Sequence, residues 1–465
     1  MKRSHLASLL AILAGLALLA AQPAAASNGM NMIGFGPYSI AMGGADLAVV
    51  GSPSAMNINP AGIARCAESE IDLGLSLVQP SLNHSDQLGN NQDDELDRVP
   101  MPFVGYVRPI GDLTFGVGLF VQGGMGAEYS NLTTPFAAQR PAKAGASGFA
   151  PAPALPATDS MRTRLGHARL TPTIAWRVRP NLALGASLNL SYATIDMELF
   201  PETSVRADLD GSGIPGDSQG DFFFGMEMES LSAVGYNLRL GFLYEHGPMT
   251  VGGTYSTKTE LDFENGTNTL NLTAMGLGKV VYDAEMTNFA WPRQMGLGIA
   301  YQIRPRLLIA ADLDWLEWSD AIATPTIRVS NPDHPMAPPS REIPLQMGWK
   351  DQWVWAAGME FEPADEWAVR LGYNYGATPV PDNLLRPVFP AIAEQHLTGG
   401  AAFSKGPWTY EIGMEYALES VKTNNNPNPQ LNPFGPGCQE TLSQFMAHFM
   451  VRRTLSRRGR AATGP

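Results

Sequence analysis

A strict alternation of apolar with polar or small residues recurs along this chain and constrains its fold more than any other feature. It lasts about eight to ten residues at a time, and then breaks at turn-forming residues. Because a period of two is that of a β-strand, the pattern predicts strands and not helices. Clear examples are residues 112–122, 182–192, 295–301, 307–315, 367–375 and 408–416.

The connections between these segments are of two kinds. Six are short turns, and seven are long segments, and the two kinds alternate along the chain. Thirteen connections predict fourteen strands between residues 69 and 453, among them a long strand over 277–303. An even number of strands, with tight turns at one end and long loops at the other, is typical of an outer-membrane β-barrel.

Charged residues lie opposite the apolar faces of several predicted strands. A soluble sandwich would bury its apolar faces together, and it would hardly place charges on the other side of the same strands. In a membrane barrel the apolar face meets lipid and the charged face meets a wet lumen. We therefore predict an all-β fold, a 14-stranded antiparallel transmembrane β-barrel over 69–453 in the outer membrane. We expect a monomer that contacts outer-membrane lipid and lipopolysaccharide.

The two ends of the chain differ from the barrel. Residues 1–26 combine a basic start, an apolar run and small residues, which predicts a secretory signal peptide. Residues 454–465 form a basic tail, expected on the periplasmic side. The net charge of −13 argues against a nucleic-acid partner.

A segment of low charge, 27–68, precedes the first predicted strand and is rich in Gly, Ala and Met. A barrel of fourteen strands lies between the sizes that side chains fill and those that leave an aqueous channel. We expect this segment to fold back into the lumen as a hatch. Within it, Asn59 can cap a short helix that begins at Pro60 and Ala61.

Five stretches, taken in order, resemble the FadL family of outer-membrane transporters for long-chain fatty acids and other hydrophobic compounds. They are 57–66, which carries the Asn-Pro-Ala motif, followed by 99–130, 170–193, 291–320 and 367–403. The resemblance implies a fourteen-stranded barrel with an N-terminal hatch, which agrees with the strand count. One departure is the basic tail, since the family commonly ends on an aromatic residue.

The resemblance also implies two sites. Asn59, Pro60 and Ala61 correspond to the hatch motif. Gly123, Gly124 and Gly126 follow the third predicted strand, where the family has an inward kink that opens a lateral exit. The alternative is that these glycines simply begin a long loop.

Inward-facing charges have two interpretations. They can form a salt-bridge network that holds the hatch, or one arginine can bind a fatty-acid carboxylate, for which its planar fork is suited. The candidate residues for contact with the ligand or the hatch are Arg169, Arg239, Arg370, Asp312, Asp314 and Glu411.

The remaining motifs do not point to catalysis. Residues 208–217 resemble the first half of a calcium loop, but Gln219 stands at the twelfth position where the pattern needs Glu, so an ordinary acidic turn is favoured. We expect no enzyme activity, no cofactor and no metal. Cys66 and Cys438 are expected at opposite ends of the barrel, hence as free thiols, with Cys438 open to reagents from outside.

The sequence thus predicts passive uptake of hydrophobic molecules, most simply long-chain fatty acids, with lateral exit through the barrel wall. Aromatic hydrocarbons taking the same route remain an alternative, because they need a similar apolar lining. A general diffusion porin and a surface adhesin are further alternatives, opposed by segment 27–68 and by the lack of a large passenger domain.

Overall fold

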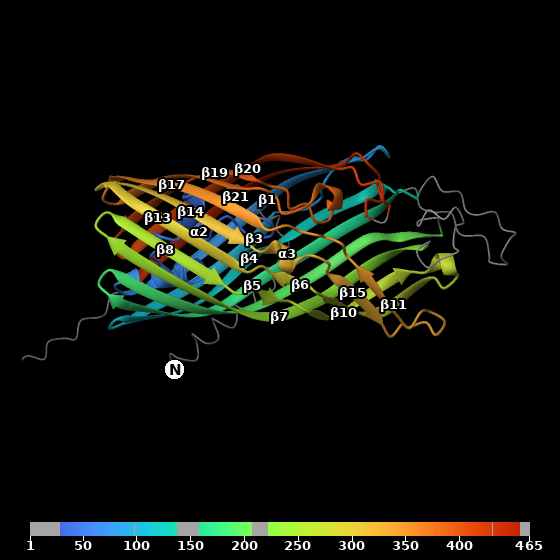
Figure 1. The fold of residues 1–465 in the computed structure, drawn as a ribbon, viewed down its shortest axis with the longest axis horizontal. Coiled ribbons are helices and arrows are strands. Elements are labelled where there is room, and N and C mark those ends of the chain that lie inside the picture. The colour runs from blue at the N-terminus through green and yellow to red at the C-terminus, as the bar shows by residue number, and fades with distance from the viewer. Residues whose placement is uncertain (1–27, 97, 137–157, 207–221, 430, 456–465) are drawn as a thin grey trace, which may run out of the picture.

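A closed ring of antiparallel strands dominates the computed structural model, which describes residues 28–96, 98–136, 158–206, 222–429 and 431–455 (Figure 1). Within these residues fourteen strands form the wall, each paired with the next. They are β1 (Ser69–Ser85), β3 (Val99–Ile110), β4 (Leu113–Thr133), β5 (Thr158–Arg179), β6 (Leu182–Arg206), β7 (Phe222–His246), β8 (Met249–Ser256), β13 (Gln294–Arg304), β14 (Leu307–Leu316), β17 (Gln352–Ala364), β18 (Trp367–Gly376), β19 (Gln395–Lys405), β20 (Trp408–Asn424) and β21 (Cys438–Leu455). The predicted fold class is confirmed.

The ring closes between the first and the last strand. β1 pairs with β21 over its whole length, from Ser69 opposite Leu455 to Ser85 opposite Gln439. Such closure satisfies the backbone hydrogen bonds that an open sheet edge would expose to lipid.

Burial follows the alternation of the sequence. Leu297 and Leu371 are 58% and 61% exposed on the outside of the ring, whereas Asp312 and Arg370 are buried on the inside. The apolar face therefore points outward and the charged face inward. None of the helices in the described residues has the length and apolar character needed to cross a membrane.

The predicted strand 277–303 is wrong, because the chain divides it into three pieces. They are β11 (Lys279–Thr287), the short β12 (Ala290–Trp291) and the wall strand β13. Asn288 has a left-handed φ of 60°, which interrupts the regular extended backbone. Pro292 follows, and it has no backbone N–H to donate to a ladder.

Further short elements extend the wall at its long-loop end. β10 pairs with β7, and β11, β15 and β16 follow from it as a continuation of the sheet (Figure 1). Their bounds, with those of the remaining short elements, are β2 (Asn91–Asp93), β9 (Thr259–Glu260), β10 (Phe263–Asn271), η4 (Thr273–Met275), α3 (Trp318–Ala321), β15 (Thr326–Ser330), β16 (Ser340–Pro344) and η5 (Asp382–Leu384).

Residues 28–68, here called the luminal segment, lie inside the ring. The segment contains α2 (Gly36–Ala41), η1 (Pro53–Asn57) and η2 (Pro60–Arg65), which appear in blue within the barrel in Figure 1. The side chain of Asn59 accepts a hydrogen bond from the Ala61 N–H at 3.2 Å and so caps η2, which is a 3-10 helix.

Glycines on the inner face of the wall let the luminal segment approach the strands. A Cβ atom at Gly185 of β6 would lie 2.3 Å from backbone atoms of Pro60 and Ala61. A Cβ atom at Gly372 of β18 would lie 2.2 Å from the Gly43 nitrogen. Backbone therefore packs directly on backbone at these two positions, and a side chain there would displace the segment.

Candidate functional site: an internal cavity beside a break in the wall

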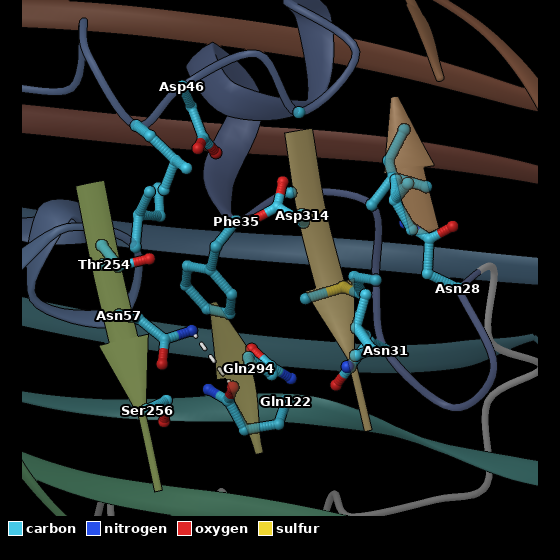
Figure 2. Close-up of a pocket in the computed structure, with 18 of the residues that line it drawn as sticks. Asn28, Asn31, Phe35, Asp46, Asn57, Gln122, Thr254, Ser256, Gln294 and Asp314 are labelled. Carbon is cyan, nitrogen blue, oxygen red and sulfur yellow. Dashed lines mark hydrogen bonds between the residues drawn. The ribbon is translucent and has the colours of Figure 1, made fainter. Parts of the chain in front are cut away.

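A cavity of about 120 Å³ separates the luminal segment from the wall. Figure 2 shows side chains from both sides of this cavity pointing toward one another. The luminal segment supplies Asn28, Asn31, Phe35, Asp46 and Asn57, and the wall supplies Gln122, Arg169, Arg239, Thr254, Ser256, Gln294 and Asp314, among others.

Gln122 of β4 joins the luminal segment to the wall. Its side-chain oxygen accepts hydrogen bonds from Asn57 Nδ2 at 3.2 Å, drawn in Figure 2, and from Arg169 Nη1 at 3.1 Å. The pairing of β4 with β5 shifts register between Val121 and Gly123, so Gln122 is the extra residue of a bulge. Bulges redirect side chains in this way.

Gly123 bends β4 toward the lumen. Its φ of 138° lies in the region that only glycine adopts easily. It forms a β-bridge with Asn31 of the luminal segment, and the side chain of Asn31 accepts a 2.5 Å hydrogen bond from Trp291 Nε1. The start of the luminal segment is thus attached to the bend.

The wall is interrupted between β3 and β4 at the same level. The two strands pair from Ile110 opposite Leu113 to Phe103 opposite Phe120. Beyond this point no β-ladder pair joins them in the residues that the structure describes, although both strands continue. The next backbone bond to β4 from this side runs from the Glu95 N–H to the Glu128 carbonyl, at 2.8 Å.

Two sequence features explain the interruption. Pro100 and Pro102 of β3 lack the N–H groups that a central strand donates. Residues 120–127 of β4 are buried one after another, so the alternation of exposed and buried positions is lost there. Gly123, Gly124 and Gly126 all lie in this part of β4, within the strand and not in the following loop.

Asp312 of β14 holds the luminal segment by its backbone. One of its carboxylate oxygens accepts the N–H groups of Asp46 and Leu47, at 2.7 and 2.8 Å. Arg239 of β7 donates to the carbonyls of Asn57 and Ile58, the latter at 3.0 Å. These two side chains are therefore already engaged by the segment.

Arg370 and Glu411 do not line this cavity. They form a second group near the short turns, where Arg370 Nε lies 2.6 Å from Glu360 and Nη1 lies 3.3 Å from Glu411. The guanidinium of Arg370 also stacks over the ring of Tyr38 at 4.2 Å. The structure thus separates the six predicted inward-facing charged residues into two groups, and both groups contact the luminal segment.

Asp46 is buried, and no cation of the described residues forms an ion pair with it. Ser39 donates a hydrogen bond to its carboxylate, and Arg239 is the nearest source of favourable charge. Loss of hydration on burial raises the pKa of Asp46 from 3.8 to about 7 despite these two partners. Asp312 and Asp314 face it from β14.

A large apolar cluster fills the lumen between this cavity and the long loops. We call it the outer cluster. It is rich in methionine and aromatic side chains, including Met125, Met161, Met197, Met226, Met228, Met286, Phe200, Phe263, Phe289, Trp291, Trp318 and Trp349.

His167 of β5 is a candidate that the sequence analysis missed. Its fully buried ring lies 4.3 Å from that of Trp291, and neither ring nitrogen has a hydrogen-bond partner among the described residues. It lies opposite Gly123 in the β4–β5 pairing, beside the bulge. A single histidine in a predicted strand gives no signal of such a position, because the bulge that places it depends on tertiary contacts.

Two expectations about loops and thiols have different outcomes. Residues 208–217, the acidic turn, lie outside the described residues. Cys66 and Cys438 are both free, as predicted. The expectation that Cys438 is open to external reagents is wrong, because Cys438, the first residue of β21, is only 1% exposed.

The closed ring with an apolar exterior, a wet interior and an interrupted wall defines an outer-membrane β-barrel built for transport. Residues 16–144 and 153–435 match the family described as outer membrane protein transport protein (OMPP1/FadL/TodX). The chain belongs to this family, whose members are transport channels and not enzymes.

Similar solved structures cover nearly the whole chain. The toluene transporter TbuX of Ralstonia pickettii has a TM-score of 0.68 at 23% identity, covering 91% of this chain and 99% of its own. The toluene transporter TodX of P. putida has a TM-score of 0.71 at 20% identity, with the same coverage. A Pseudomonas aeruginosa FadL homologue has a TM-score of 0.68 at 17% identity, covering 93% and 100%.

One curated relative matches a short stretch only. An uncharacterized Chlorobium limicola protein, encoded in the 5′ region of a phosphoenolpyruvate carboxykinase gene, is 41% identical over 70 residues. The match spans 15% of this chain and 34% of that protein.

The pKa of Asp46 predicts that the luminal segment is held more firmly in acid. A released segment ionises Asp46 near pH 3.8, whereas the seated segment keeps the proton to about pH 7. Seating is therefore most favourable below about pH 4 and weakens as the pH rises to about 7. Hydrogen-exchange protection factors for residues 39–50 should fall between pH 5 and pH 8. Asp46→Asn should reduce that fall, and an equal fall in both proteins would contradict this assignment.

Proposed function

We propose that this barrel carries small hydrophobic molecules across the outer membrane by passive diffusion, with uncharged monoaromatic compounds as its preferred cargo. The observation that carries the proposal is the outer cluster. It leads from the long loops to Trp291 and His167, beside the bend at Gly123. Flat rings and flexible thioethers form a lining that adapts to apolar ligands of varied shape.

The charges of the lumen favour an uncharged cargo. Arg169 donates to Gln122, Arg239 donates to the luminal segment, and Arg370 is paired with two glutamates. A carboxylate would compete with these partners, although the Nε atoms of Arg169 and Arg239 are buried with no hydrogen-bond partner among the described residues. This supports the salt-bridge interpretation of the inward-facing charges over the carboxylate-binding one.

The proposed route has two stages. A molecule enters the outer cluster from the long loops, and the luminal segment then acts as a hatch that stops it from continuing along the barrel axis. It leaves through the interruption between β3 and β4, past Gly123, Gly124 and Gly126. An apolar molecule that exits into lipid avoids rehydration, which would cost about 0.8 kcal/mol per methylene.

The names of the similar proteins support this choice of cargo. They describe TbuX and TodX as toluene transporters and CymD as a monoaromatic hydrocarbon channel. Since these proteins share at most 23% identity with this chain, the lining of the outer cluster remains the main argument.

Long-chain fatty acids are the second candidate, and Arg386 favours them. It lies in the segment that contributes Leu385, Val388 and Phe389 to the outer cluster. Its Nε atom is buried with no hydrogen-bond partner in the described part of the chain. A carboxylate at the entrance could accept from it while the alkyl chain enters the cluster.

Binding measurements with toluene and oleate distinguish the two candidates. In lipid nanodiscs, we expect saturable toluene binding that Trp291→Ala weakens at least about tenfold, since the substitution removes a buried ring. Trp353→Ala is the matched control, because Trp353 is 55% exposed on the lipid face. Saturable oleate binding that is lost in Arg386→Gln, without toluene binding, would instead support the fatty-acid candidate.

The lateral exit predicts that stiffening β4 blocks delivery but not capture. Valine at position 123 cannot keep a φ of 138°, and its Cβ would lie 2.8 Å from the Met30 carbonyl. Gly123→Val should therefore straighten the strand and slow uptake of labelled ligand into cells at least about tenfold, with binding retained.

The control is Gly399→Val on β19, where a Cβ would meet only the end of the flexible Leu371 side chain, at 3.3 Å, and the Arg370 carbonyl, at 3.5 Å. It should transport normally. Wild-type uptake by Gly123→Val would place the exit elsewhere in the wall.

A further inference from the structure

A cluster of potential metal ligands lies at the long-loop end of the seam that closes the barrel. His84 of β1 stands directly opposite Glu440 of β21, and Cys438 lies two residues before Glu440 on the same face. His84, Cys438 and Glu440 are at most 1% exposed. Cys438 is also a member of the outer cluster, so the three side chains lie at the border of that cluster, against the seam.

The three side chains converge on one point. A ligand atom from each lies within 4.8 Å of the ligand atoms of the other two. His84 Nδ1 is 2.6 Å from Glu440 Oε1, and Cys438 Sγ is 3.9 Å from the same oxygen. Imidazole nitrogen, thiolate sulfur and carboxylate oxygen are the three donor types that Zn²⁺ uses in proteins.

Asp86 orients the imidazole for such a role. Its Oδ2 atom lies 3.2 Å from His84 Nε2, and the same oxygen accepts a 2.7 Å hydrogen bond from Asn90. A metal-binding histidine usually donates its second ring N–H to a carboxylate, which fixes the ring and leaves the other nitrogen for the metal. Here Nδ1 is the nitrogen left facing Cys438 and Glu440.

Two polar atoms around the cluster have no partner among the described residues. They are Glu440 Oε2 and the hydroxyl of Tyr129, whose ring lies 5.8 Å from that of His84. A buried carboxylate oxygen without a hydrogen bond is costly, so its position needs an explanation. A cation between Glu440, His84 and Cys438 would supply the missing interaction.

We propose that His84, Cys438 and Glu440 bind one Zn²⁺ ion, with Asp86 as the group that positions His84. Three protein ligands leave a fourth position for water. Ligand atoms of a tetrahedral zinc site are about 3.5 Å apart, so Glu440 turns its free oxygen toward the ion and releases its hydrogen bond with His84. The ion joins β1 to β21, and its role is to reinforce barrel closure.

The turn that follows β1 borders the site, since its first residue, Asp86, contacts His84. Its residues Gln87, Leu88 and Gly89 are exposed. The turn is held by Asp86 Oδ1, which accepts the backbone N–H groups of Leu88 and Asn90.

Cobalt titration of the full chain, purified without a histidine tag, tests the site. Co²⁺ replaces Zn²⁺ in such sites and gives a near-ultraviolet charge-transfer band when a thiolate binds it. We expect one equivalent of Co²⁺ per barrel with this band, and its loss on addition of one equivalent of Zn²⁺. Cys438→Ser should abolish the band and weaken Zn²⁺ binding at least about 100-fold.

Two controls separate this site from other thiols and histidines. Cys66→Ser removes the second thiol and should leave the band unchanged. His396→Asn removes a buried histidine that pairs with Glu415 at 3.0 Å, and it should also have no effect. Glu440→Gln, nearly identical in shape, provides a second loss-of-binding variant if Cys438→Ser fails to fold.

Absence of stoichiometric Co²⁺ binding to the folded wild-type barrel would overturn the proposal. The same holds if the band survives in both Cys438→Ser and Glu440→Gln, or disappears in Cys66→Ser. In the first case the cluster would be a hydrogen-bonded ion pair across the seam and nothing more.

Discussion

Pairing of β1 with β21 is the constraint on which the other features of this protein depend. A membrane gives no water to an unpaired strand edge, so the first and last strands must meet. They do so over seventeen residues, Ser69 to Ser85. Closure then separates an apolar exterior from a polar interior, and it creates a lumen large enough for the luminal segment. Each of the other wall strands also pairs with its two neighbours. The partial interruption between β3 and β4 can therefore be tolerated without opening the barrel.

The interruption between β3 and β4 and the luminal segment are physically connected. Asn31 pairs with Gly123 where β4 bends, and Asn57 bonds to the bulge residue Gln122. Asp312 and Arg239 hold the same segment from the opposite wall through backbone groups. A movement of the luminal segment would therefore change the contacts of β4 at the β3–β4 interruption. On the proposed function, this is how the state of the hatch could be coupled to the lateral exit.

Much of the wall was predictable because each strand obeys a local rule. Alternation identifies which face is apolar, and turn residues mark the short connections, so the number of wall strands and the inward direction of Arg370 and Asp312 follow from the sequence. The errors lie where tertiary structure overrides the pattern. In 277–303 the apolar alternation continues across Asn288 and Pro292, although the chain leaves the wall there. The bulge at Gln122 and the burial of Cys438 depend on contacts with distant segments. The local alternation of apolar and polar residues gives no information on such contacts.

The inward-facing charges show a second limit of sequence reasoning. Alternation placed Arg169, Arg239 and Arg370 in the lumen, but it could not say what each side chain meets. The structure gives all three internal partners, and it places a methionine-rich and aromatic cluster above them. The outer cluster is assembled from long loops and strand extensions that lie far apart in the sequence. Its composition is visible only after folding, and it is what shifts the proposed cargo toward uncharged rings.

In the proposed mechanism the luminal segment closes the barrel axis, so that cargo must leave sideways. Planar-bilayer conductance tests it most directly, by comparing the intact barrel with a variant that lacks residues 30–62. We expect little steady conductance for the intact protein and a large, steady ion current for the folded deletion variant. Equal conductance in the two proteins would contradict the claim, and a large current through the intact barrel would indicate a general diffusion pore.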